Sequence, residues 1–356
     1  MEKKIMYRKT YAEINLDNIY YNVKTLIEFL KDYKYHIGVV KADCYGHASN
    51  KVVKKIIKAG CNYLAVATLE EALEIRKDIK NIPILCLGKI ENDSLNVCKK
   101  NNITISINSL EHLKSLNIKL LKNIKIHLKI NTGMNRLGIS NKKELEEVLS
   151  LLKNNSLFME GIYTHIYDDE NKENTLKQIA LFENITSSID LKNIPIVHFG
   201  ASGYSLNYPK VSYVNGCRLG IAMYGLTNTK LDLKSTFSLY SSVIQINEVE
   251  NMTVGYNGAY EVKDKERIAI VPIGYADGII RKNTGRHVYI NNEKYLIVGN
   301  ICMDMLFIKV DDKVKIGDKV VIIKDNKHIN EIASHLDTIN YEVICSIGKR
   351  IPRIYK

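Results

Sequence analysis

The feature that most constrains the fold is a series of eight short apolar segments that alternate with amphipathic stretches. Each apolar segment is hydrophobic at nearly every position, as expected for a strand that is covered on both faces. Eight such strands alternating with helices predict a (β/α)8 barrel, and a doubly wound parallel sheet is the competing arrangement. The predicted strands are 35–42, 62–68, 82–88, 102–108, 124–131, 160–167, 194–201 and 218–225.

The amphipathic stretches between these strands have the spacing of surface helices. The clearest start signal is at Thr68, which is followed three residues later by Glu71 in a capping-box pattern. We therefore expect a helix over 68–80, together with helices over 16–33, 141–153 and 173–189.

After about residue 230 the pattern changes to apolar segments separated by short turns, with little helix signal before 331–336. Such a pattern predicts a mostly antiparallel β domain. We expect a barrel domain over 1–232 and a C-terminal β-strand domain over 233–356. The predicted strand segments of the second domain are 235–249, 267–277, 286–300, 305–310 and 318–324.

Composition narrows the functional classes. The longest apolar runs have strand length, so we expect no membrane span. The net charge is +12, but the lysines are scattered, and we expect no nucleic-acid partner. Seven cysteines without a C-x-x-C pair indicate free thiols in a reducing compartment. We therefore expect a cytoplasmic protein without a metal site.

Polar side chains follow several of the predicted barrel strands. In such barrels the loops after the strands carry the chemistry. Lys41, Arg136, His165 and Ser202 fall at these positions, and Arg218 comes at the start of the eighth strand signal. Taken singly, His165 also fits a buried core histidine and Ser202 a turn former. Together they indicate an anionic ligand and a reactive lysine. A partly desolvated lysine attacks aldehydes to give a Schiff base, so pyridoxal phosphate is a candidate cofactor.

Seven segments carry a resemblance to a known family. They are VVKADCYGH, KINTGMNRLG, YTH, RLGIAMYGL, PIGYADG, VGNICMD and RIPRIY. In this order and at these spacings, the chain resembles the alanine racemase family of fold-type III pyridoxal-phosphate enzymes, from near residue 8 to the C-terminus. The resemblance implies interconversion of L- and D-alanine, and D-alanine supply for peptidoglycan.

The resemblance also implies roles for individual residues. Lys41 matches the Schiff-base lysine, which is also one of two catalytic bases. Arg218 matches the arginine that faces the pyridine nitrogen, which it keeps unprotonated because a guanidinium cannot accept a proton. Lys129 matches a lysine that is often carbamylated and then orients Arg136. Further matches are Tyr45, His165, Ser202, Gly220, Ile221 and Lys349 at the cofactor, Arg136 and Met303 at the substrate, and Tyr275, Asn300 and Asp304 at the substrate corridor and its surroundings.

The second base is expected to be Tyr256, because inverting a Cα centre needs a proton removed on one face and returned on the other. Family members place this tyrosine in the neighbouring subunit's active site. The resemblance therefore implies a homodimer with shared active sites.

Four positions depart from the family pattern. VGYNG surrounds Tyr256 where S-Y-G is usual, and Ala201 stands where asparagine usually precedes the serine. Asn300 replaces an arginine of the corridor, and Lys349 replaces a tyrosine that touches the phosphate. Lys349 does not fill space as a rigid ring does, so serine is an alternative substrate to alanine.

Two further alternatives differ in class. A non-catalytic pyridoxal-phosphate carrier is a barrel alone, and the expected β domain with Tyr256 argues against it. A barrel-type amino-acid decarboxylase also pairs a barrel with a β domain, but TGMNRLG and ICMD do not belong to that family.

Overall fold

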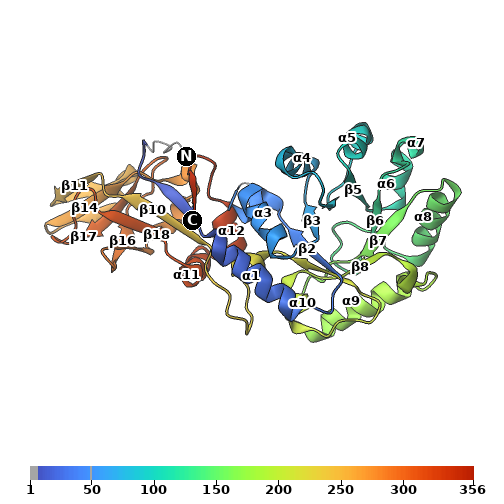
Figure 1. Ribbon diagram of the computed structural model, residues 1–356. Coiled ribbons are helices and arrows are strands. Elements are labelled where there is room, and N and C mark those ends of the chain that lie inside the picture. The colour runs from blue at the N-terminus through green and yellow to red at the C-terminus, as the bar shows by residue number, and fades with distance from the viewer. Residues whose placement is uncertain (1–6, 49) are drawn as a thin grey trace. The chain divides into compact units, whose positions relative to one another are not determined.

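The computed structural model describes residues 7–48 and 50–356 (Figure 1). Contacts divide these residues into two compact units. One unit contains residues 19–44 and 50–233, and we call it the barrel unit. The other contains residues 7–18, 45–48 and 234–356, and we call it the sheet unit.

The core of the barrel unit is a closed ring of eight parallel strands, which confirms the predicted (β/α)8 barrel. Each strand pairs with the next one along the chain, and β9 closes the ring by pairing with β2, where Gly216 is opposite Tyr35. Nearly every strand residue is buried, because side chains fill the interior and helices cover the outside. The strands are β2 (Tyr35–Val39), β3 (Tyr63–Val66), β4 (Ile84–Cys86), β5 (Ile103–Ile107), β6 (Ile126–Lys129), β7 (Met159–Tyr163), β8 (Ile196–His198) and β9 (Gly216–Leu219).

The helices of the barrel unit lie outside the strands, as α4, α5 and α8 show in Figure 1. The capping box predicted at Thr68 is present: the Thr68 hydroxyl accepts from the Glu71 N–H, and Glu71 accepts from the Thr68 N–H. The helices are α1 (Leu16–Phe29), α3 (Asn50–Ala59), α4 (Leu69–Asp78), α5 (Leu95–Lys100), α6 (Leu110–Ser115), α7 (Ile118–Leu121), α8 (Lys142–Asn154), α9 (Lys172–Ile185) and α10 (Ser202–Asn207), with 3-10 turns η1 (Asn92–Ser94), η2 (Leu191–Asn193) and η3 (Ile221–Tyr224).

The sheet unit is built on a nine-stranded sheet, in agreement with the predicted C-terminal β domain. Its order is β11-β14-β17-β16-β15-β18-β10-β1-β19, and all neighbours are antiparallel except β1 and β19. The strands are β1 (Tyr11–Ile14), β10 (Phe237–Ser242), β11 (Gln245–Val249), β14 (Glu266–Val271), β15 (His287–Ile290), β16 (Glu293–Val298), β17 (Leu306–Val310), β18 (Lys319–Ile323) and β19 (Arg353–Tyr355).

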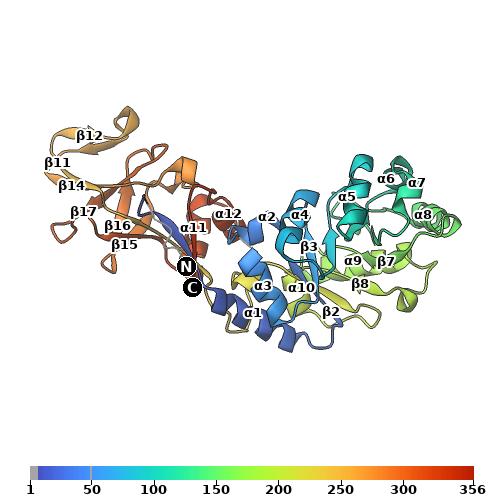
Figure 2. The same ribbon diagram turned by 45° about the horizontal axis from the view of Figure 1, so that its top comes forward.

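Smaller elements complete the sheet unit. Strands β12 (Met252–Val254) and β13 (Tyr260–Val262) form a separate antiparallel pair, which stands at the tip of this unit in Figure 2. The helices are α11 (Asn326–Leu336) and α12 (Asn340–Cys345), and the 3-10 turns are η4 (Tyr256–Gly258), η5 (Tyr275–Asp277) and η6 (Arg281–Asn283). Strands β1, β12, β13 and β19 and helix α12 were not predicted, because each is short and none lies in a long apolar run.

Residues 45–48 join the sheet unit through hydrogen bonds to its strands. The Tyr355 hydroxyl donates to the carbonyl of Ala48 at 2.8 Å, and the Arg353 Nε donates to the carbonyl of Gly46 at 3.1 Å. The His47 Nε2 and the Thr236 hydroxyl lie 2.8 Å apart. Residues near both ends of 234–356 therefore bind the segment 45–48.

No helix in the described part of the chain is both long and apolar enough to cross a membrane.

Candidate active site

Lys41 follows strand β2, which ends at Val39, and opens a turn of unusual backbone, α2 (Lys41–Tyr45). The next four residues, 42–45, all have φ between 50° and 55°. This left-handed conformation costs a non-glycine residue about 1–2 kcal/mol. Glu71 helps to hold the turn, because its Oε1 accepts a hydrogen bond from the Ala42 N–H at 2.6 Å. The carboxylate that caps α4 therefore also fixes the chain beside Lys41, and such strain is typical of functional sites.

Five cationic or ionisable side chains gather at the C-terminal ends of the barrel strands: Lys41, Lys129, Arg136, His165 and Arg218. We call them the rim cluster. Burial and the charges of Arg136, Arg218 and Lys41 together lower the pKa of Lys129 to about 8. Burial and the same cations, with Lys129, lower the pKa of His165 to about 3. The rim cluster therefore concentrates positive charge, which suits an anionic ligand.

Arg218 is buried and makes contacts to neutral groups. Its Nη1 lies 2.7 Å from the Nδ1 of His198, and its Nη2 donates to the Thr164 carbonyl at 2.8 Å. The Nη2 is also 3.3 Å from the Nδ1 of His165. Within the described residues, no carboxylate forms an ion pair with it. Burial lowers the pKa of Arg218 to about 10.

The prediction placed Arg218 at the start of a strand over 218–225, and the structure corrects this. Strand β9 is Gly216–Leu219, so Arg218 lies inside it, and 221–224 form the 3-10 turn η3. The shift arises because β9 pairs with β2 from Gly216 onward, so the apolar run after Leu219 lies beyond the sheet.

The loops after β8 and β9 meet at a single hydrogen bond. The Ser202 hydroxyl, which is buried, accepts from the Gly220 N–H at 3.0 Å. Ser202 is the first residue of α10 and Ile221 is the first residue of η3. The backbone N–H groups at the start of both elements therefore lie beside this bond. Ala201 offers no side-chain cap to α10. Ser202, Gly220 and Ile221 therefore share one corner of the barrel.

Sequence reasoning missed two residues near this corner and the rim cluster. Asp169 accepts a hydrogen bond from the Tyr204 N–H, and burial raises the pKa of its carboxyl group. His198 contacts Arg218 directly, as described above. The only sequence signal for His198 was its place near the end of a predicted strand, and many other residues share such a place.

The other predicted residues belong to the sheet unit. Tyr256 stands in the turn η4 with 68% of its surface exposed, and the Asn300 side-chain amide donates to its carbonyl at 2.9 Å. Met303 is 52% exposed and Tyr275 is 42% exposed. Their segments are joined, because the Tyr275 N–H donates to the Cys302 carbonyl at 3.0 Å. Tyr45 is buried beside the ring of Tyr341, and Lys349 is exposed.

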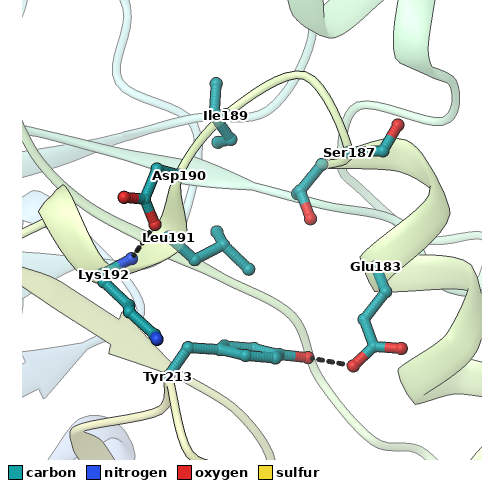
Figure 3. A pocket seen from close by; sticks show the side chains of 8 residues that line it. Glu183, Ser187, Ile189, Asp190, Leu191, Lys192 and Tyr213 are labelled. Atoms are coloured by element: carbon teal, nitrogen blue, oxygen red, sulfur yellow. Dashed lines mark hydrogen bonds between the residues drawn. The ribbon is translucent and has the colours of Figure 1, made fainter.

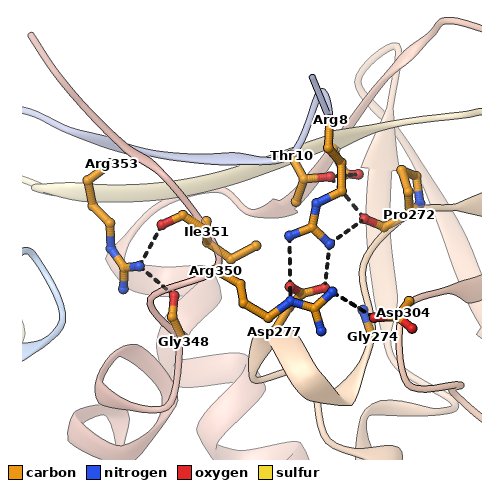
Figure 4. Close-up of polar contacts among 11 residues, drawn as sticks. Arg8, Thr10, Pro272, Gly274, Asp277, Asp304, Gly348, Arg350, Ile351 and Arg353 are labelled. Carbon is orange, nitrogen blue, oxygen red and sulfur yellow. Dashed lines mark hydrogen bonds and ion pairs between the residues drawn. The ribbon is translucent and has the colours of Figure 1, made fainter. Parts of the chain in front are cut away.

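A buried carboxylate holds these segments of the sheet unit in place (Figure 4). Asp277 receives two hydrogen bonds of 2.8 Å from the guanidinium of Arg8. Its Oδ1 is 3.6 Å from the Nε of Arg350, whose Nη2 pairs with Asp304 at 2.7 Å. One network therefore links the segments that carry Tyr275, Met303 and Lys349.

A separate hollow of about 210 Å³ lies on the barrel unit near the end of α9 (Figure 3). There the Tyr213 hydroxyl donates to Glu183 at 3.0 Å, and Asp190 accepts from the Lys192 N–H at 3.0 Å. None of the predicted site residues lines this hollow.

Comparison with known proteins decides the family. Residues 14–228 match the model of the alanine racemase N-terminal domain, and residues 236–355 match that of the C-terminal domain. This chain belongs to the alanine racemase family. Family membership makes it a racemase, an enzyme of the isomerase class.

Individual relatives match along nearly their whole length. Alanine racemase of Halalkalibacterium halodurans is 37% identical over 98% of this chain and 95% of its own. A solved alanine racemase of Clostridium difficile 630 superposes with a TM-score of 0.92 at 34% identity, over 99% of this chain and 97% of its own. The structure from Bartonella henselae, which has covalently bound pyridoxal phosphate, gives a TM-score of 0.88 at 27% identity, over 98% of this chain and 99% of its own.

Proposed function

We propose that this racemase interconverts L- and D-alanine and that it uses pyridoxal phosphate to do so. Relatives that cover almost the whole chain are alanine racemases, and one of them holds that cofactor covalently. The observation that carries the proposal is that one barrel rim holds both Lys41 and a buried Arg218 that contacts neutral acceptors. An amine and a guanidinium of this kind fit an aldehyde and an unprotonated ring nitrogen.

The rim residues would hold the cofactor as follows. Lys41 would bind its aldehyde carbon, and Arg218 would donate a hydrogen bond to its ring nitrogen. His165 would contact the ring as a neutral imidazole, because its low pKa prevents protonation at working pH. Tyr45, Ser202, Gly220, Ile221 and Lys349 would hold the phosphate. When bound, the cofactor withdraws electrons from the substrate and makes its Cα–H bond acidic.

Other residues of the chain position the substrate. Arg136 and Met303 bind its carboxylate, and Tyr275 and Asn300 line the corridor that leads to it. Lys129 orients Arg136 once carbamylation has converted its amine into an anion. Such a modification is supported by the pKa of about 8, because a neutral amine reacts with carbon dioxide and an ammonium group does not.

Two bases carry the proton. Lys41 acts on one face of the substrate Cα, and Tyr256 of a partner subunit acts on the other, in a homodimer with shared sites. The exposure of Tyr256, Met303 and Met305 on the sheet unit supports a covering partner. We propose that the enzyme is cytosolic and that its product, D-alanine, supplies peptidoglycan, as the family implies. No disulfide joins any of the seven cysteines, all of which lie within the described residues, and this suits a reducing compartment.

The substitution Tyr256→Phe tests the two-base mechanism. It should lower kcat for alanine by about 100-fold or more, because one proton donor is lost, while the cofactor stays bound. Tyr260→Phe is the matched control, because the Tyr260 hydroxyl bonds to Glu266 at 2.7 Å in the same unit and has no proposed catalytic role. A non-catalytic cofactor carrier would show no racemisation in any of the three proteins.

Serine is a second candidate substrate. By the family resemblance, the exposed Lys349 stands at a position where a tyrosine is usual, and it would leave the space of that ring unfilled. The ratio of kcat/KM for L-alanine and L-serine measures this directly, and Lys349→Tyr should shift the ratio towards alanine. The discrimination gained by filling such space is about 10-fold or more. An unchanged ratio in Lys349→Tyr would remove the support for serine.

A further inference from the structure

A line of buried polar side chains runs through the barrel interior behind Arg218. His198 lies 2.7 Å from Arg218, the Nε2 of His198 lies 3.0 Å from the Nδ1 of His127, and the Nε2 of His127 lies 3.2 Å from Glu160. We call Arg218, His198, His127 and Glu160 the relay. It crosses from β9 through β8 and β6 to the beginning of β7, away from the rim that carries Lys41.

In each hydrogen bond of the relay, the donor is on the side of Arg218 and the acceptor is on the side of Glu160. A guanidinium only donates, so the Nδ1 of His198 accepts and its proton lies on Nε2. That proton is donated to the Nδ1 of His127, whose own proton therefore lies on Nε2 and is donated to Glu160. Burial lowers the pKa of both histidines, which keeps the two imidazoles neutral. The carboxylate of Glu160 is thus the terminal acceptor of a series that begins at Arg218.

The backbone is shaped to put Glu160 into this series. Alternation along β7 would send Glu160 to the opposite face from Tyr163. However, Ile126 pairs with Met159 and His127 pairs with Gly161, so Glu160 is an extra residue at a bulge. A bulge of this kind redirects a side chain. Gly161 makes room for the imidazole, because a Cβ there would lie 2.6 Å from the Cε1 of His127.

The environment of Glu160 keeps it charged. Its Oε2 accepts from the Tyr63 hydroxyl at 2.7 Å, and its Oε1 pairs with the Nζ of Lys125 at 2.6 Å. Burial alone would raise the pKa of Glu160, but hydrogen bonds from His127, Lys125 and Tyr63 outweigh it and lower the pKa to about 2. The Lys125 side chain is 41% exposed, so solvent reaches this end of the relay.

Aromatic packing fixes the middle of the relay. The ring of Tyr163 stacks on that of His198 at a centroid distance of 4.6 Å, and the Arg218 guanidinium lies 5.3 Å from the same ring. The Tyr163 hydroxyl is 2.6 Å from that of Ser106. His198 therefore has little freedom to turn away from Arg218.

We propose that Glu160 is the remote counter-ion of Arg218 and a positioning residue for catalysis, acting through His127 and His198. The proposal rests on the proposed function, in which Arg218 faces the cofactor ring nitrogen. Hydrogen bonds in series polarise one another, so the carboxylate strengthens the acceptor that His198 presents to Arg218. It thereby orients the guanidinium and limits how much hydrogen-bond donation Arg218 directs to the ring nitrogen.

The first test measures the relay in the protein without its cofactor, by nitrogen NMR of labelled histidines. Glu160→Gln removes the charge and keeps an acceptor, whereas Lys125→Met removes the cation that offsets that charge. The Nδ1 resonance of His198 should move in opposite directions in these two variants. His112→Gln is the matched control, because His112 is buried and bonds to the Ile90 carbonyl outside the relay. Shifts of equal sign, or none, would overturn the proposal.

The second test uses the cofactor-loaded enzyme. Glu160→Gln should lower kcat for alanine about tenfold with KM within about twofold, as loss of a supporting partner behind a site residue does. Its bound-cofactor absorption spectrum should change with it, and Lys125→Met should change that spectrum in the opposite sense. If Glu160→Gln does not fold, Lys125→Met and Tyr63→Phe carry both tests, and both should shift His198 in the same direction, because each removes a donor to the Glu160 carboxylate.

The two proposals fail differently. A wild-type protein without racemase activity would contradict the proposed function, and the NMR result would still decide whether Glu160 acts on His198. In the other case the wild type is an active racemase, but Glu160→Gln matches His112→Gln in kcat, spectrum and His198 resonance. The proposed function would then stand. The relay residues would then only pack together, without a role in catalysis.

Discussion

Asn300 donates a hydrogen bond from its side-chain amide to the backbone carbonyl of Tyr256, at 2.9 Å. Two departures from the family pattern therefore meet, because Asn300 replaces the usual arginine and the glycine before Tyr256 replaces the usual serine. Gly255 has φ 79° and ψ −178°, a conformation open almost only to glycine. The altered residues thus act together to hold Tyr256 in position.

Asn300→Ala should lower kcat for alanine about fivefold, the equivalent of one net hydrogen bond of about 1 kcal/mol. Steady-state kinetics and the exchange of substrate Cα hydrogen with deuterated water measure the effect. Asn247→Ala on the edge strand β11 of the same unit is the control. An Asn300→Ala enzyme as active as the control would show that the bond does not position Tyr256.

Lys129 should make stability depend on alkaline pH. Its folded-state pKa of about 8 lies below the ordinary 10.5, so the unfolded state binds more protons between these values. Stability then rises with pH across this window, by about 1.4 kcal/mol per pH unit for this one group. The measurement is denaturant unfolding of wild type and Lys129→Met from pH 7.5 to 9.5; a pH-independent difference between them would contradict the low pKa.

Bicarbonate provides the corresponding test of carbamylation. At pH 7, with a pKa of about 8, roughly a tenth of the Lys129 amine is neutral and able to react. Added bicarbonate should raise the Tm of the wild type, because the anion formed would pair with Arg136. Lys129→Met should show no such rise, and an equal rise in both proteins would point to a general salt effect.

Buried histidines should make the protein sensitive to acid. The folded-state pKa is about 3 for His165 and about 4 for His328, each mainly because of burial. Below the ordinary value of 6.5 the unfolded state binds more protons, so stability falls as pH falls. Each group should remove about 1.4 kcal/mol per pH unit between 6.5 and its folded pKa. His328→Gln should flatten the dependence of unfolding free energy on pH between 6.5 and 4.5; the same slope as wild type would refute this.

Asp277 should be a stability determinant of the sheet unit. It is fully buried between Arg8 and Arg350, and removing one partner of a buried pair leaves the other charge uncompensated. Asp277→Asn should lower the free energy of unfolding by about 3 kcal/mol. Asp304→Asn is the control, because this exposed partner of Arg350 should cost under about 1 kcal/mol. Equal losses in the two variants would argue against the buried network.

The sequence predicted the barrel well because its signal is local. Continuous apolar runs mark the eight strands, and the Thr68 capping box marks the start of α4. No sequence pattern indicated that β1 pairs with β10 and β19, since this four-residue strand acquires its partners only from distant segments. Tertiary pairing, rather than local pattern, defines such elements.

Site residues with a local sequence signal were predicted, and those that depend on tertiary structure were not. Lys41 and His165 were found near the ends of predicted strands, Arg218 at the start of one, and Lys129 only through the family resemblance. The structure brings these side chains into one cluster. Glu160 was missed because strand alternation turns it away from the barrel interior. Only the bulge beside His127 reverses that direction, and a bulge has no signature in the residue types of this segment.

The hydrogen bonds of residues 45–48 have a consequence for how the protein is made. Synthesis delivers this segment immediately after Lys41, but its partners Thr236, Arg353 and Tyr355 leave the ribosome much later. The segment that follows the turn at Lys41 therefore lacks these bonds while the remainder of the barrel is translated. A fragment that ends after β9 would contain every barrel strand and none of these three partners.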